Sequence, residues 1–211
     1  MYWYVSRTKV EALAQAKRGR GPLRSVGSKI KAPVLLEASA ELAFDEDLRR
    51  DLQRVRRRLD RDPDVRAFDA LDDDPGPVFS FQGRAARALA EDAYLLALAS
   101  GATALILVGS RWHVLGEVRD VPGIPGSSMG DPVGAVVGAF ANPEPGSDLL
   151  SGLSYAWQAV MRQGIPGAVV PKIHGLALFG GSFPVDRRHT RRADGNVTRL
   201  VVGSPIYVEQ T

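Results

Sequence analysis

The fold is decided by residues 77–118, PVFSFQGRAARALAEDAYLLALASGATALILVGSRWHVLGEV. Within this stretch, Val78–Phe81 is a short aromatic and β-branched run bounded by proline and glycine, which predicts a strand. The following residues, Arg84–Leu98, carry apolar side chains at spacings of three and four, which predicts a helix. Many of these residues are alanines, so the predicted helix would lie close to a sheet.

The second half of this stretch predicts two more strands. Thr103–Val108 is a continuous apolar run, which favours a central strand covered on both faces, although a buried turn of helix can have the same composition. Gly109-Ser110 fits a two-residue hairpin turn, so we expect residues 111–118 to return as an antiparallel strand. The strand period of two would then place four side chains on one face, which is the main candidate for chemistry: Arg111, His113, Leu115 and Glu117.

Length and composition describe one globular domain spanning residues 1–211, with 45% hydrophobic residues for a core. The chain has no cysteine, which removes disulfides, thiolate nucleophiles and cysteine-ligated metals and fits a reducing cytoplasm. We find no basic leader and no run of 18 apolar residues, so we expect a cytoplasmic protein without a membrane span. The 27 basic and 24 acidic side chains are nearly balanced, which gives little support to nucleic-acid or membrane binding.

The remaining patterns complete a single α/β or α+β domain, in which about four helices pack on a mixed, mainly antiparallel sheet. Helices are predicted over residues 7–18, 45–61, 84–98 and 147–163. Strands are predicted over residues 2–5, 33–37, 78–81, 103–108, 111–118, 135–140, 168–179 and 197–208.

The predicted helix over residues 45–61 carries many arginines, but acidic residues stand four positions away from several of them. This spacing favours ion pairs on a solvated outer face over a surface that binds nucleic acid. The expected pairs are Asp45 with Arg49, Glu46 with Arg50, Arg56 with Asp60 and Arg58 with Asp62.

Two further segments are basic. Residues 17–31 are rich in glycine and predict a flexible loop, which either is simply solvated or closes over an anion. Residues 186–196 predict a hairpin tip with the densest positive charge in the chain. If the protein binds a phosphate-bearing or acidic partner, we expect this tip to take part through Arg187, Arg188, Arg191 and Arg192, which surround His189.

The sequence offers few catalytic groups. The three histidines, His113, His174 and His189, stand on separate segments without an HExxH pair, so we predict no metal site and no cofactor. Ser110 and His113 suggest a nucleophile and a base, yet the GxSxG motif of a nucleophile elbow is missing. Arg111, His113 and Glu117 are better interpreted as a polar patch that orients a ligand, in which Glu117 would raise the pKa of His113.

Three short motifs resemble an uncharacterised bacterial family that is common in Streptomyces and related actinobacteria. They are the opening Tyr2–Val10 (YWYVSRTKV), the central Gly109–Gly116 (GSRWHVLG) and the closing Gly203–Val208 (GSPIYV). The arginine, alanine and aspartate content is similar to that of high-GC actinobacteria. The resemblance implies no known activity and no catalytic residues to carry over, and it points only to bacterial signalling or defence as a setting.

We therefore predict a cytoplasmic binding or interaction module that recognises a small anionic ligand or a protein partner, through Arg111, His113 and the basic tip. The alternative is a metal-independent hydrolase or transferase that uses His113 as general base, with Ser110 and Glu117 beside it. A third hypothesis is nucleic-acid binding through Arg187–Arg192. The residues favour binding over catalysis without deciding between them. An unpaired edge in the β-rich C-terminal third would allow a homo-oligomer.

Overall fold

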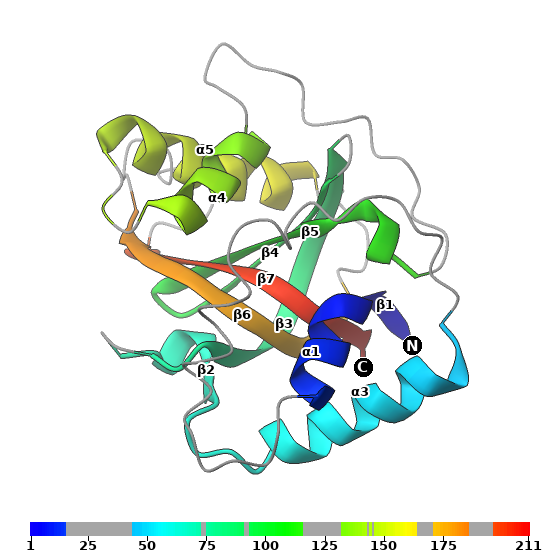
Figure 1. Ribbon diagram of the computed structural model, residues 1–211. Coiled ribbons are helices and arrows are strands. Elements are labelled where there is room, and N and C mark those ends of the chain that lie inside the picture. Colours follow the sequence, from blue (N-terminus) through cyan, green and yellow to red (C-terminus); the bar gives the residue numbers. More distant parts are fainter. Residues whose placement is uncertain are drawn as a thin grey trace.

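A computed structural model of the chain is shown in Figure 1. It describes residues 1–15, 44–72, 75–90, 93–115, 132–142, 144, 146–163, 171–185 and 196–211. The helices are α1 (Arg7–Gln15), α3 (Glu46–Leu59), α4 (Pro132–Ala141) and α5 (Ser147–Gln163), with short 3₁₀ turns η2 (Phe68–Ala70) and η3 (Arg111–His113). The strands are β1 (Tyr2–Val5), β2 (Arg66–Ala67), β3 (Val78–Ala90), β4 (Ala93–Ser100), β5 (Thr103–Ser110), β6 (Lys172–Pro184) and β7 (Arg199–Gln210).

Five of the strands close into a barrel. β3, β4, β5 and β7 are neighbours in that order, and β6 closes the ring because it pairs with both β7 and β3. Only the β5–β7 pair within this ring is parallel. β1 joins β7 antiparallel, and β2 joins β3 parallel. The predicted mixed, mainly antiparallel sheet with four helices is therefore broadly confirmed, whereas its closure into a barrel was not predicted.

The alternation of side chains along each strand separates the barrel interior from its outer face. Tyr94 and Leu96 of β4 and Leu107 of β5 belong to the interior cluster. Their neighbours Leu95 and Val108 belong to the cluster that packs under α4 and α5. Because both faces of β4 and β5 are covered, these strands have no polar side, as is usual for buried strands.

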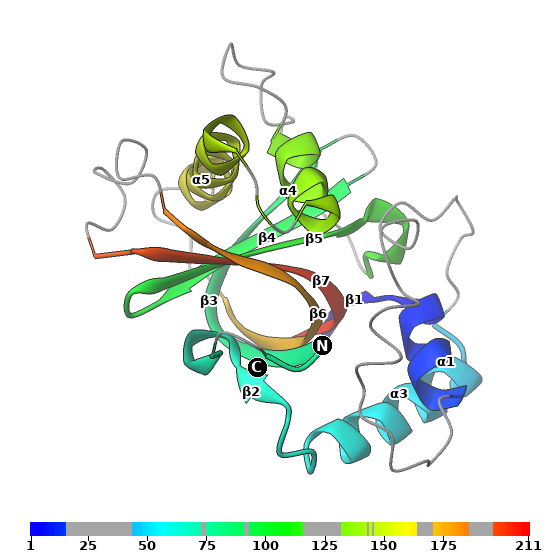
Figure 2. The same cartoon turned by 60° about the vertical axis from the view of Figure 1, so that its left-hand side comes forward.

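Helices cover the barrel on two flanks (Figure 2). We call the first the α4–α5 flank, because these two helices lie together against the sheet. We call the second the α1–α3 flank, where α3 places one apolar stripe against the sheet and α1. That stripe has the four-residue and three-residue spacing of a helix face and consists of Leu48, Leu52, Val55 and Leu59.

Several predicted elements are confirmed within the described residues. β1 and α5 have the predicted bounds, and β5, α3, β6 and β7 overlap their predictions closely. The helix predicted over residues 7–18 is observed as α1. β7 continues through Gly203-Ser204-Pro205, and its register against β6 shifts there. The predicted loop at 17–31, the strand at 33–37 and the basic tip up to Gly195 lie outside the described residues.

The helix predicted over residues 84–98 is wrong, because these residues form most of β3 and β4, which pair antiparallel. A spacing of four, as between Ala85 and Leu89, is also two periods of a strand. Both residues lie in the barrel interior, whereas Ala86 and Ala88 face the α4–α5 flank. Alanines on two buried faces therefore produced a helix-like pattern in a strand.

The strand predicted over residues 135–140 is also wrong, because it lies within α4. Pro132 is the first residue of this helix, where the missing N–H of proline costs nothing. Val136 and Ala139 then lie three apart on the buried side. In this segment, the position of the proline indicated the secondary structure better than the short β-branched run did.

The arginines of α3 pair differently from the i,i+4 prediction. The observed carboxylate partners are Asp47 for Arg50, Asp51 for Arg54 and Glu209 of β7 for Arg56. Asp45 instead caps α3, accepting the Leu48 N–H at 2.8 Å, and binds Arg7 of α1 at 2.6 Å. Among the described segments, no helix combines the length and apolar character needed to cross a membrane.

Candidate functional site

The described residues that follow β5, Arg111–Leu115, do not return as a strand. The Ser110 hydroxyl accepts the backbone N–H of Trp112 at 3.4 Å, and the chain turns into η3. This arrangement buries His113 and leaves Trp112 42% exposed. Beyond η3, Val114 makes an isolated bridge to Tyr4 of β1. The strand predicted from residue 111 onward is therefore wrong for residues 111–113, because a serine side chain ends β5 at the position where a hairpin was expected, and Glu117 lies outside the described residues.

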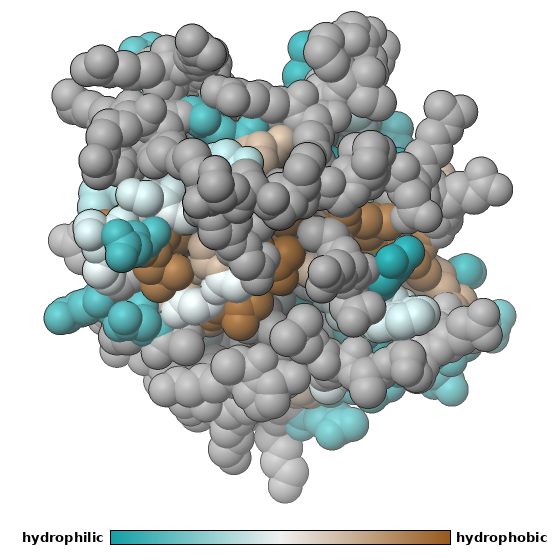
Figure 3. Space-filling view, turned by 90° about the horizontal axis from the view of Figure 1, so that it is seen from above, coloured by the Kyte–Doolittle hydropathy of each residue, from teal (hydrophilic) through white to brown (hydrophobic). Residues whose placement is uncertain are grey.

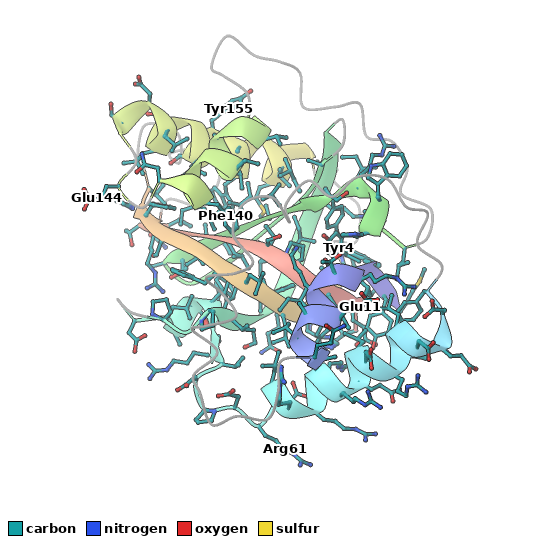
Figure 4. All side chains as sticks on the ribbon, viewed as in Figure 1. Tyr4, Glu11, Arg61, Phe140, Glu144 and Tyr155 are labelled. Atoms are coloured by element: carbon teal, nitrogen blue, oxygen red, sulfur yellow. The ribbon has the colours of Figure 1, made fainter. Side chains whose placement is uncertain are left out.

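His113 instead joins two aromatic side chains at one end of the barrel. We call Tyr4, Tyr94 and His113 the tyrosine–histidine cluster. The Tyr4 hydroxyl lies 3.2 Å from Nδ1 of His113, and the Tyr4 ring stacks on Tyr94 with centroids 5.5 Å apart. Figure 4 shows Tyr4 near α1 and the end of β5. A Cβ atom at Gly109 would overlap the Tyr4 hydroxyl oxygen, so this hydroxyl position requires a glycine on β5.

The environment keeps the tyrosine–histidine cluster uncharged at neutral pH. Burial, followed by the positive charge of Lys9, lowers the pKa of His113 from 6.5 to about 4. Burial raises the pKa of Tyr94 far above its usual value, and Arg87 opposes this shift only weakly. The predicted rise in the pKa of His113 is therefore wrong, because desolvation dominates. Glu117, which was expected to cause it, lies outside the described residues.

A second polar group lies where α1 packs against β7. We call Ser6, Lys9 and Ser204 the lysine–serine cluster. Lys9 is 1% exposed, and its ammonium donates to Ser204 Oγ at 2.6 Å and to the Pro205 carbonyl at 3.1 Å. Ser6 comes directly before α1, and its backbone N–H donates to the Ile206 carbonyl at 2.9 Å. The start of α1 is thus fixed to three consecutive residues of β7.

One hydroxyl in each cluster lacks a hydrogen-bond partner among the described residues. They are the hydroxyls of Tyr94 and Ser6, and both residues are 0% exposed. A buried polar atom without a partner costs about 1–3 kcal/mol, so proteins usually satisfy such atoms through other residues, water or a ligand. This end of the barrel therefore contains polar atoms that its own described contacts do not explain.

The sequence found part of this site and missed the rest. His113 and Ser110 are on one segment, but the Ser110 hydroxyl is occupied by the turn, and Arg111 lies half-buried on η3. Glu117, Arg187, Arg188, Arg191 and Arg192 lie outside the described residues, so their predicted roles stay predictions. The missed residues are Tyr4, Ser6, Lys9, Tyr94 and Ser204. One signal was available, since Lys9 precedes Leu13 by four positions and thus shares the buried stripe of α1.

A separate polar group fastens α3 to the barrel. Arg56 donates to Glu209 at 2.9 Å and to the Tyr2 hydroxyl at 2.8 Å, and it lies over the ring of Tyr207. His174 lies 3.2 Å from the same Glu209 carboxylate. Burial, chiefly, raises the pKa of Tyr207 to about 12. Across the described ranges, no three histidine, aspartate or glutamate side chains are grouped so that they could hold a metal ion.

Fold and site together define a small helix-flanked β-barrel with buried polar side chains at one end. Residues 1–142 match DUF7019, a family of unknown function, and the chain belongs to that family. The matched residues include the whole tyrosine–histidine cluster and Lys9, whereas β6 and β7 lie beyond them. No curated protein and no solved structure matches the chain. The expected membership in a family without a known activity is confirmed, and an actinobacterial origin stays a prediction.

Proposed function

We propose that the protein is a binding module for a small anionic ligand, which it takes at the barrel end that carries the tyrosine–histidine cluster. The observation behind this proposal is the fully buried hydroxyl of Tyr94, which has no described partner beside the Tyr4–His113 pair. Mouths of β-barrels are common ligand sites, with a few polar groups set among apolar walls. A ligand acceptor or donor at this point would satisfy the hydroxyl.

The local charge favours an anion over a cation or a neutral molecule. Lys9 is close enough to His113 for its positive charge to add to the effect of burial in lowering the pKa of the imidazole, so a cation lies near the cluster. His113 and Tyr94 are neutral at physiological pH and add no negative charge. A buried site also suits a small ligand better than a protein partner, which would need an exposed surface.

The hydrolase or transferase alternative is not supported by these contacts. A general base works best when its pKa is near the operating pH, and an imidazole with a pKa of about 4 is a weak base at pH 7. Its Nδ1 atom is also engaged with the Tyr4 hydroxyl. Nucleic-acid binding through Arg187–Arg192 gains no support, because those arginines lie outside the described residues.

The test is native mass spectrometry of the protein purified from its own or a related host, compared with two matched variants. We expect the wild type to retain a small anionic molecule and Tyr94→Phe to lose most of it. Tyr155→Phe removes the same hydroxyl from the half-buried Tyr155 on α5 and should retain the ligand. A bare wild-type mass, or equal retention by Tyr94→Phe, would contradict the proposal.

A further inference from the structure

Ser6 occupies the position of a helix cap without acting as one. A serine before a helix usually accepts a backbone N–H of the first turn with its hydroxyl. Here the backbone of Ser6 is fully used, since its N–H donates to Ile206 and its carbonyl accepts from Val10 at 3.0 Å. Its hydroxyl is fully buried and binds none of the described residues. This hydroxyl therefore lies at the positive end of α1 without capping it.

Ser204 provides a second hydroxyl on the opposite side of the same contact. Its oxygen accepts from the Lys9 ammonium at 2.6 Å, and both residues are 1% exposed. A serine hydroxyl that accepts a hydrogen bond still has its own proton to donate. Because the Lys9 ammonium already donates to the Ser204 oxygen, we expect the Ser204 hydroxyl to donate its own proton to another acceptor.

The three residues of the lysine–serine cluster lie at one contact between the start of α1 and β7. Ser6 and Lys9 are three positions apart at the start of α1, so they lie on one face of it. Both touch β7 within Ser204–Ile206. The next residues along α1 are half-buried Arg7 and exposed Thr8, so the cluster lies close beneath the surface. Two hydroxyls, an ammonium and a helix N-terminus are therefore brought to the same contact between α1 and β7, where each of them favours a negatively charged acceptor.

We infer that the lysine–serine cluster binds the phosphoryl group of the anionic ligand. This inference rests on the proposed function and specifies the ligand as a phosphate ester. The dipole at the N-terminus of a helix attracts phosphate, and the buried Lys9 ammonium adds a positive charge at the same place. A phosphoryl group carries up to two negative charges, whereas a carboxylate carries one, so the positive charge of Lys9 and of the start of α1 favours the phosphoryl group.

Inorganic phosphate is the probe, titrated into ¹⁵N-labelled full-length protein at constant ionic strength. We expect saturable shifts of the backbone amides of residues 6–9 and 204–206. Ser204→Ala and Lys9→Met should each weaken phosphate binding about tenfold or more, as expected for a hydrogen bond to a charged group. The matched controls, exposed Ser182→Ala and exposed Lys172→Met, should bind as the wild type does. Equal weakening in the controls, or none in the cluster variants, would overturn the inference.

Ser6→Ala separates a binding role from a structural one. Removing an unsatisfied buried hydroxyl should leave the phosphate-free protein as stable as the wild type or more stable, while phosphate binding falls. The midpoint of denaturation without phosphate reports the first effect, and the amide titration reports the second. A less stable variant with unchanged phosphate binding would show that the hydroxyl serves the fold and would overturn the inference.

The two proposals can fail separately. If phosphate shifts none of the amides at the lysine–serine cluster while Tyr94→Phe loses a retained anion, the phosphoryl inference fails and the proposed function stands. If phosphate binds the cluster but Tyr94→Phe retains its ligand, the placement of the ligand at the tyrosine–histidine cluster fails instead.

Discussion

The two flanks of the barrel are held by different forces. On the α4–α5 flank, helices touch through small and apolar residues, and a Cβ atom at Gly152 would lie 3.0 Å from the Ala135 Cβ. Seen from above, apolar side chains show among polar ones on the side that carries these helices (Figure 3). On the α1–α3 flank, arginines add polar links to the apolar stripe, such as Arg58 to the Leu13 carbonyl at 2.7 Å. Among the described contacts, the α4–α5 flank therefore depends chiefly on apolar packing, and the α1–α3 flank depends on apolar packing together with ion pairs and hydrogen bonds.

Because of this difference, we expect the two flanks to respond to different changes in sequence and solvent. Close apolar packing is sensitive to changes in side-chain volume and insensitive to salt or pH. Half-exposed ion pairs tolerate changes in volume, but salt weakens them and protonation removes them. The candidate site lies beside α1, on the charged side of the molecule, where a change of pH or of bound ions acts most directly.

The largest expected effect is loss of packing on the α4–α5 flank. Trp157 of α5 is 1% exposed, and its indole N–H donates to the Leu98 carbonyl at 3.3 Å. Trp157→Ala should lower the free energy of unfolding by about 3–5 kcal/mol, because it opens a large cavity. Urea denaturation at low and high salt measures this loss, which should be the same at both. A loss that depends on salt would remove the distinction between the flanks.

The next largest expected effect is a loss of stability in acid, and it arises on the side of the barrel that carries α1. Since folding lowers the pKa of His113 from 6.5 to about 4, the unfolded chain binds this proton more readily between those values. The contribution of His113 to the free energy of unfolding is therefore fully present above pH 6.5 and is lost as the pH drops toward 4. Between pH 7.5 and pH 5 we expect a loss of about 2 kcal/mol from this group. Denaturation of the wild type and of His113→Gln at both pH values measures it, and an equal loss in His113→Gln would contradict this assignment.

The smallest expected effect is removal of one link on the α1–α3 flank. Arg56→Met keeps most of the apolar stem over Tyr207 but loses the Glu209 and Tyr2 bonds. Because the ion pair is partly exposed, the loss should be at most about 1 kcal/mol in low salt and smaller in high salt. Arg54→Met, which removes a more exposed arginine of the same helix, is the control. A loss above that of Trp157→Ala would reverse the comparison.

Elements were predicted most accurately where the sequence pattern fitted only one type of secondary structure. The stripe of α3 repeats only at helical spacing, and α5 begins at the serine that follows a proline- and glycine-rich segment, so both helices were found at nearly their observed bounds. Residues 84–98 failed because alanines on two buried faces fit a helix and a strand equally. Barrel closure could not be predicted, because it depends on β6 pairing with β3 across a separation that no local pattern encodes.

The candidate site was predicted in part for a related reason. His113 was identifiable as a rare residue type next to a turn, whereas its neighbours Tyr4 and Tyr94 come from strands whose adjacency only the barrel creates. Lys9 was identifiable from its apolar surroundings on α1, but its partner Ser204 is almost the whole sequence away. When a site is assembled from distant segments, each segment contributes a single residue, and no local sequence pattern marks that residue as part of a site.

The position of β7 in the barrel has a consequence for how the chain folds. β7 pairs with β1, β5 and β6 at once, and its residue Glu209 lies opposite Tyr2. Until β7 has been synthesised, no barrel can close, and β1, β5 and β6 have unpaired edges. Contacts over such separations slow folding and leave strands open to wrong pairing. During translation the growing chain should therefore need protection from aggregation, and chaperone dependence should fall sharply once residues 199–210 can pair.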